Sequence, residues 1–209
     1  MPELLGDDAL LEAWCRGDAQ AGRGLLDRHF HVLYGFFAPR VGDATPDLIQ
    51  RTLATCVELR ERMPRSVSVR AYLLGIARNH LLHHLRKQAR ERRALERQAR
   101  TPALHVPSPS AAVGADAEQR RLLRALRRLP LDMQLTIELF FWEELKIDEI
   151  AQVLEVAPGT VKSRLARAKD ALRTELAREA ERAPLRATLD SFERWSRALA
   201  EGRPRDRLA

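Results

Sequence analysis

Apolar side chains recur along this chain at the three- and four-residue spacing of α-helices, and no segment shows the strict apolar–polar alternation of a half-buried β-strand. The helical pattern is interrupted at residues 101–116, which contain three prolines and one glycine. Proline cannot continue a helix, because it lacks a backbone donor and its ring clashes with the preceding turn, so a stretch of this composition is typical of a linker. The sequence therefore predicts an all-α protein with two small helical domains joined by a linker.

We expect the first domain at residues 1–95, the linker at 96–117, the second domain at 118–179 and a C-terminal extension at 180–209. Three apolar stripes predict core-facing helices in the first domain: Leu26, Phe30, Leu33 and Phe37; Ile49, Leu53, Cys56 and Val57; and Val69, Tyr72, Leu73, Ile76, Leu81 and Leu85. A stripe in the extension predicts a short amphipathic helix that packs on the protein's own domains: Leu185, Leu189, Phe192, Trp195 and Leu199.

Composition narrows the class of protein. The chain has 209 residues and a net charge of +7, which suggests a polyanionic partner. No apolar run approaches the roughly 20 residues that a membrane span needs. Cys15 and Cys56 lie far apart and form no CxxC motif. We therefore expect a cytoplasmic protein that has no membrane association, no disulfide, no metal site and no cofactor.

Two short helices separated by a tight turn are the most informative feature of the second domain. The first helix carries the stripe Ile147, Ile150, Ala151 and Leu154, and the second, over residues 159–178, carries Val161, Leu165, Ala168, Leu172 and Leu176. Small and basic side chains share the other side of the second helix. This pattern is typical of a helix-turn-helix that reads the major groove. We expect DNA contacts from Thr160, Lys162, Ser163, Arg164, Arg167 and Lys169.

Two residues of this motif depart from the usual helix signals. Glu155 lies in the turn, where glycine is common, and Ala157 lies where an N-capping serine is common. Before the motif, Asp132 is expected to cap the helix that runs through Ile137 and Trp142.

Short motifs in both domains point to one family. The second domain contains ALRRLP at residues 125–130, DEIA at 148–151 and GTVKSRLARA at 159–168. The first contains DLIQRT at 47–52, RAYLLGIARN at 70–79 and LRK at 85–87. In this order, residues 8–178 resemble a bacterial extracytoplasmic-function sigma factor, with region two first and region four second.

The resemblance implies a function in transcription initiation and no enzymatic activity. Region four would bind the upstream promoter element as a duplex, and region two would melt the downstream element and hold a flipped base beside the loop at residues 63–69. The implied partners are promoter DNA and core RNA polymerase. DNA contacts in region two would come from Arg78, Asn79 and Arg86. Polymerase contacts would come from Asp47, Gln50, Arg51 and Ala54.

One departure from the family concerns the surface that docks on polymerase. Members usually carry an Asp-Ala-Glu-Asp cluster, whereas residues 44–47 here read ATPD. One hypothesis is that a Ser/Thr kinase restores the charge, because a phosphate adds about −1.5 to −2 units. The candidate acceptors are Thr45, Thr52 and Thr55. In the alternative, Asp43 and Asp47 supply enough negative charge.

Other functions remain as alternatives to this interpretation. A conventional helix-turn-helix regulator would bind DNA alone as a dimer, and a helical adaptor would bind only proteins. The C-terminal extension could take the place of an anti-sigma factor or recruit one. An enzyme is the weakest alternative, because the chain lacks the G-x-S-x-G, H-E-x-x-H, G-x-G-x-x-G and Walker motifs.

Overall fold

The structure is a computed structural model that describes residues 5–64, 67–98 and 117–180. All regular structure in these ranges is helical, and the chain divides into two compact units, Met1–Ala111 and Ala112–Ala209. Most of the expected linker and nearly all of the C-terminal extension lie outside the described residues, so the amphipathic helix expected there stays a prediction.

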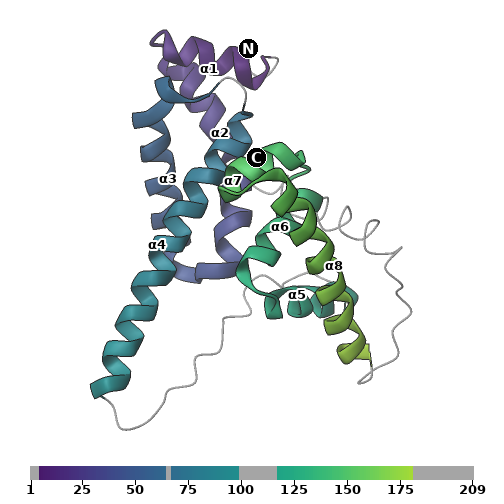
Figure 1. Ribbon diagram of the computed structural model, residues 1–209. Helices are drawn as coiled ribbons and strands as arrows, with labels where there is room; N and C mark the ends of the chain where they lie inside the picture. Colours follow the sequence, from purple (N-terminus) through teal and green to yellow (C-terminus); the bar gives the residue numbers. More distant parts are fainter. Residues whose placement is uncertain (1–4, 65–66, 99–116, 181–209) are drawn as a thin grey trace. The chain divides into compact units, whose positions relative to one another are not determined.

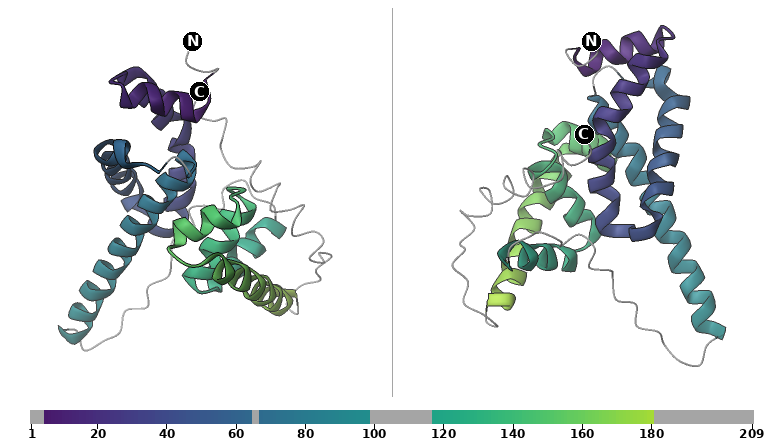
Figure 2. Two further views of the ribbon diagram at one scale, coloured as in Figure 1. Left: turned by 45° about the horizontal axis from the view of Figure 1, so that its top comes forward. Right: turned by 180° about the vertical axis from the view of Figure 1, so that it is seen from behind.

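Four α-helices build the first unit: α1 (Asp7–Cys15), α2 (Ala19–Val41), α3 (Thr45–Leu59) and α4 (Val69–Gln98). Short 3-10 helices at Gly42–Ala44 and Arg60–Arg62 flank α3. Helices α2, α3 and α4 pack on one another, and α1 lies across one end of α2 (Figures 1 and 2). Helix α4 continues to Gln98, three residues into the expected linker.

Polar contacts fix how α1 meets α2. Asp18 caps α2, because its carboxylate accepts hydrogen bonds from the backbone N–H groups of Gln20 (2.9 Å) and Ala21 (3.0 Å). Asp7 of α1 pairs with Arg28 at 2.8 Å and with Nε2 of the buried His29 at 2.7 Å. Burial lowers the pKa of His29. The negative charge of Asp7 acts in the other direction, but its effect is smaller. The buried position therefore favours the neutral form of the imidazole.

The apolar stripe expected on α2 is confirmed at Leu33 and Phe37, which are fully buried, and wrong at its other two positions. Phe30 is 38% exposed and Leu26 is only half-buried. The buried side of α2 also includes Ala21, Leu25, His29, Val32 and Phe36. Because α2 contacts α1, α3 and α4, its buried side is broad. It also includes a histidine, which a search for apolar residues overlooks.

A similar shift occurs on α3. Ile49 and Cys56 are buried as expected, whereas Val57 is 39% exposed. Thr52 takes a core position instead, with its hydroxyl donating to the Leu48 carbonyl at 2.7 Å. This bond satisfies the hydroxyl within the helix, so the methyl group can pack like that of valine. Leu48 completes the buried side of α3.

The second unit contains α5 (Ala117–Arg128), α6 (Leu131–Phe141), α7 (Ile147–Leu154) and α8 (Pro158–Ala180). Helix α8 packs on the other three. Its apolar stripe is confirmed, because four of the five expected residues are buried and Leu176 is partly buried. The core cluster joins α5, α6 and α8 through Leu122, Ala125, Leu126, Leu129, Ile137, Trp142, Leu165, Ala168 and Leu172.

The start of α6 corrects one expectation. Pro130 occupies the N-cap position, and Asp132 lies one residue into the helix rather than before it. The turn is instead closed by Gln134, whose side-chain amide donates to the carbonyls of Leu129 (2.7 Å) and Arg127 (3.3 Å). These bonds satisfy carbonyls at the C-terminus of α5 that have no partner within that helix. The Asp132 carboxylate is left to interact with α8.

Candidate nucleic-acid interface

A three-residue turn positions α8 against α7. Helix α7 ends because Glu155 adopts a left-handed conformation, with φ 54° and ψ 47°. The N–H of Val156 then bonds back to the Ala151 carbonyl at 3.0 Å, and the Ala157 carbonyl accepts from Thr160 at 2.9 Å. The turn therefore has the geometry that the sequence predicted, and a glutamate occupies the position that suits glycine.

The start of α8 presents the expected polar residues to different degrees. Lys162, Ser163 and Arg167 are exposed, and Thr160 is half-buried. The Ser163 hydroxyl donates to the Thr160 carbonyl at 3.1 Å, and Arg167 Nε donates to the Ser163 carbonyl at 3.4 Å. Three side chains on the first turns of α8 thus remain open to a nucleic acid.

Two of the predicted DNA contacts are held against α6. The Arg164 side chain is 16% exposed, and its Nε lies 3.2 Å from the Asp132 carboxylate. The Lys169 ammonium lies over the ring of Phe141 at 5.1 Å and over that of Phe140 at 5.9 Å. The sequence pattern predicted that both cations lie on α8, but it did not predict their partners on α6. Asp132, an acidic residue at the start of α6, was the sequence signal that could have indicated the partner of Arg164.

The residues expected to dock polymerase form one exposed side of α3. Asp47, Gln50, Arg51 and Ala54 are all exposed, as their positions away from the apolar stripe predicted. Arg51 Nε pairs with the Asp47 carboxylate at 3.0 Å, one helical turn away. An exposed pair of this kind adds little to stability, so both groups can exchange partners at modest cost.

The DNA contacts expected from the first unit lie on α4. Asn79 and Arg86 are exposed, whereas Arg78 is half-buried. Arg78 donates to the Asn79 side-chain oxygen at 3.3 Å, although the two residues leave the helix about 100° apart. Residues 65–66, within the loop expected to border the flipped base, lie outside the described residues.

The three phosphorylation candidates differ in access. Thr52 is fully buried and Thr45 is 3% exposed, which argues against modification of the folded unit at either position. Thr55 is half-buried, with its hydroxyl 3.1 Å from Nε2 of His80. Burial lowers the pKa of His80, and the charge of Arg51 adds to the effect. Only Thr55 therefore stays a candidate for a kinase.

Two other features of the described residues bear on the class of site. Over residues 5–64, 67–98 and 117–180, no helix combines the length and apolar character needed to cross a membrane. Within the same ranges, no three His, Cys, Asp or Glu side chains gather as metal ligands.

Comparison with known proteins agrees with this geometry. Residues 25–91 match the family model for sigma-70 region 2, and residues 119–172 match the model for sigma-70, region 4. The ECF RNA polymerase sigma factor SigL of Mycobacterium tuberculosis is 31% identical over 164 residues, which cover 76% of this chain and 90% of that protein. The ECF RNA polymerase sigma-E factor of Haemophilus influenzae is 25% identical over 185 residues, which cover 84% of this chain and 98% of that protein.

Two solved structures share the fold. The sigma factor RpoE from Bartonella quintana, in complex with the anti-sigma factor NepR, has a TM-score of 0.55 at 22% identity and covers 79% of this chain and 98% of its own. CnrH, in complex with the cytosolic domain of CnrY, has a TM-score of 0.58 at 21% identity, and the match covers 82% of this chain and 97% of the CnrH chain. With both region models matched in order, and with a relative above 30% identity over most of each chain, this protein belongs to the ECF RNA polymerase sigma factors, which are transcription factors for promoter-specific initiation.

Proposed function

We propose that this chain binds core RNA polymerase through α3, recognises the upstream promoter element with α8 and opens the downstream element with α4. The observation that carries the proposal is the exposed polar side of α8, because it begins the second helix of a helix-turn-helix whose other side is firmly packed. An α-helix fits the major groove, where Arg167 can pair with a guanine edge and Ser163 with a base or a phosphate.

The Asp132–Arg164 pair suits α8 to contact the DNA backbone as well as the base edges. Arg164 lies on the same side of α8 as Ser163 and Arg167, but Asp132 holds it close to α6. A guanidinium fixed in this way reaches the edge of the groove without losing much side-chain entropy. Arg164 is therefore suited to a phosphate at the border of the site, while Arg167 extends into the groove.

Strand opening is assigned to α4. Extruding a base costs a few kcal/mol, and a protein offsets this cost by contacts to the base and to its backbone. Asn79 offers an exposed amide for the base or sugar, and Arg78 and Arg86 offer charge for phosphates. Asn79 and Arg86 lie on the same side of α4, about two turns apart, so a single strand can touch both.

The partners follow from this assignment. Core RNA polymerase supplies the chemistry of RNA synthesis, and the chain supplies placement and strand separation. Two structural relatives are bound to an anti-sigma factor or to the cytosolic domain of another protein. We propose the same class of restraint here, with the C-terminal extension or a Ser/Thr kinase acting on Thr55 as alternative controls.

The experiment separates polymerase docking from promoter recognition. Asp47→Arg is expected to weaken binding to core polymerase about tenfold, because it reverses a negative charge on the exposed side of α3 that docking uses. Asp27→Arg makes the same reversal at an exposed position of α2 and serves as the control. Arg167→Ala should leave core binding intact and cost holoenzyme–promoter binding about 1–3 kcal/mol. Equal loss of core binding in both arginine variants would contradict the docking assignment.

A further inference from the structure

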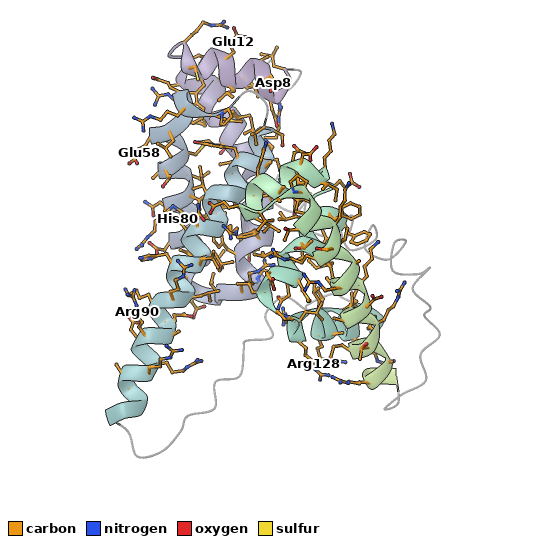
Figure 3. All side chains as sticks on the ribbon, in the orientation of Figure 1. Asp8, Glu12, Glu58, His80, Arg90 and Arg128 are labelled. Carbon is orange, nitrogen blue, oxygen red and sulfur yellow. The ribbon has the colours of Figure 1, made fainter. Side chains whose placement is uncertain are left out.

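A histidine of α4 contacts α3 beside the residues assigned to polymerase docking. His80 is half-buried, and its Nε2 lies 3.1 Å from the Thr55 hydroxyl of α3. Figure 3 labels His80 together with Glu58, an exposed residue of α3. The hydrogen bond crosses from one helix to the other, so the imidazole of His80 is held against α3 although the residue belongs to α4.

Three residues of α3 form a row that leads from the docking carboxylate to this histidine. Asp47, Arg51 and Thr55 follow one another at four-residue intervals, and side chains at this spacing lie on one side of a helix, one turn apart. Arg51 Nε pairs with the Asp47 carboxylate at 3.0 Å, and Thr55 contacts His80. His80 therefore lies at the border of the exposed side of α3 that the proposed function assigns to polymerase.

The charged and titratable groups around His80 come from α3 and α4. Burial lowers the pKa of His80, the charges of Arg51 and His83 lower it further, and Asp47 acts in the other direction. Helix α2 also packs on α4, but within the described ranges none of its charged groups acts on this pKa. His84, one turn along α4, has its Nε2 buried without a hydrogen-bond partner among the described residues. At pH 8 His80 is therefore neutral, and it gains a proton only below about pH 6.5, the ordinary pKa of histidine.

A single proton changes the charge that this side of α3 presents. Asp47 and Glu58 are exposed there and negative, and Arg51 is exposed and positive, so one negative charge is left over. Aspartate and glutamate stay ionised at pH 5.5, because their ordinary pKa values are about 3.9 and 4.3. A protonated His80 beside this side would cancel the remaining negative charge.

We infer that His80 is a positioning residue of the polymerase-docking surface and that its protonation weakens binding to core polymerase. This inference rests on the proposed function, since it takes Asp47 as a negative charge that polymerase binds. A neutral His80 holds Thr55 and leaves the Asp47 carboxylate to the polymerase. An imidazolium would attract that carboxylate and repel the basic surface that docks on it. Binding should therefore strengthen as the pH rises through the histidine range and level off above it.

The test measures the affinity of the full chain for core polymerase at pH 8 and at pH 5.5, at constant ionic strength. His80→Gln is neutral at both pH values, and His80→Lys is charged at both. The control is His83→Gln, which removes an exposed histidine about 60° round α4 from His80. Titration of the polymerase itself is common to all four proteins, so differences between them report on this chain. Circular dichroism at both pH values verifies that each protein is folded.

Between pH 8 and pH 5.5, the wild-type chain should lose roughly threefold more affinity than His80→Gln, the size expected for one charge at a solvent-exposed interface. His83→Gln should keep more than half of this extra loss. At pH 8, His80→Lys should bind roughly threefold more weakly than His80→Gln, because only the lysine is charged. This second comparison is made at one pH, so it does not depend on the stability of the chain in acid.

Three results would overturn the inference. The first is an equal pH dependence in the wild-type chain and His80→Gln. The second is an equal reduction of that dependence by His83→Gln, which would show a general effect of charge on α4. The third is equal binding of His80→Lys and His80→Gln at pH 8. If the wild-type chain does not bind core polymerase at pH 8, the proposed function fails together with the inference. If it binds and one of the three results is found, only the inference fails.

Discussion

Two glutamates of the second unit adopt backbone conformations that favour glycine: Glu144 has φ 53° and Glu155 has φ 54°. A left-handed conformation costs a residue with a Cβ about 1–2 kcal/mol, whereas glycine adopts it freely. Glu155 follows α7 in the helix-turn-helix, and Glu144 lies between α6 and α7. Both turns around α7 therefore contain local strain that the packed core offsets.

Glu144→Gly should raise the free energy of unfolding by about 0.5–1 kcal/mol, because relief of the strained φ exceeds the added flexibility of the unfolded chain. The side chain of Glu144 is exposed, so little packing is lost. Glu144→Ala is the matched control, since alanine keeps the Cβ and should bring no gain. Urea unfolding followed by circular dichroism measures the difference. Equal stabilisation by alanine and glycine would contradict the account.

Two glycines of α2 provide a second matched pair. A Cβ added to Gly22 would lie 2.4–2.6 Å from ring atoms of Trp14, whereas one added to Gly24 would meet nothing within 4 Å. Gly22→Ala should therefore destabilise the protein by about 1–3 kcal/mol through overpacking between α1 and α2. Gly24→Ala should stabilise it by about 0.5–1 kcal/mol through helix propensity. Thermal unfolding of the two variants checks the opposite signs, and equal shifts would refute the close packing of α1.

At the scale of the helix, the sequence pattern predicted α8 best. Its stripe packs against α5, α6 and α7, so a simple count of apolar residues at helical spacing finds the buried side. The pattern was less successful on α2 and α3, where His29 and Thr52 are buried with Asp7 beside the His29 Nε2 and the Leu48 carbonyl accepting from the Thr52 hydroxyl. A polar residue can enter a core when its partner is present, and a partner distant in sequence leaves no periodic signal.

The candidate site shows the same division between what the pattern reveals and what it misses. The exposed positions of α3 follow directly from its helical phase, because whatever lies away from the buried stripe faces outward. The restraint on Arg164 depends on Asp132, which belongs to another helix, and only the structure brings the two together. Register within one helix is thus readable from the sequence, whereas contacts between helices are not.

Helix α3 yields a prediction about charge in the core. Thr52→Glu should unfold the first unit or cost several kcal/mol, because a carboxylate would replace a fully buried hydroxyl. Thr55→Glu should leave the unit folded, since Thr55 is half-buried beside His80. Circular dichroism and unfolding of both variants separate these outcomes. If Thr52→Glu is as stable as Thr55→Glu, the core position of Thr52 on α3 is wrong.

Basic residues gather on particular sides of single helices, and the unit that contains the helix-turn-helix is not strongly basic as a whole. Residues 118–180 contain the helix-turn-helix but carry a net charge of only +1, out of +7 for the chain. Because non-specific attraction to DNA depends on the number of phosphates neutralised, we expect the chain alone to bind duplex DNA weakly. Under the proposed function, promoter affinity then depends on polymerase, which would hold both units on one DNA.

The most direct test is in vitro selection and transcription from randomised duplexes, with the chain alone, with core polymerase alone and with both. We predict that only the mixture selects fragments, that these share two sequence elements at a fixed spacing, and that RNA synthesis begins downstream of the second element. If the chain alone selects inverted half-sites, which a symmetric dimer would recognise, and core polymerase changes nothing, the protein is a conventional regulator and the account is contradicted.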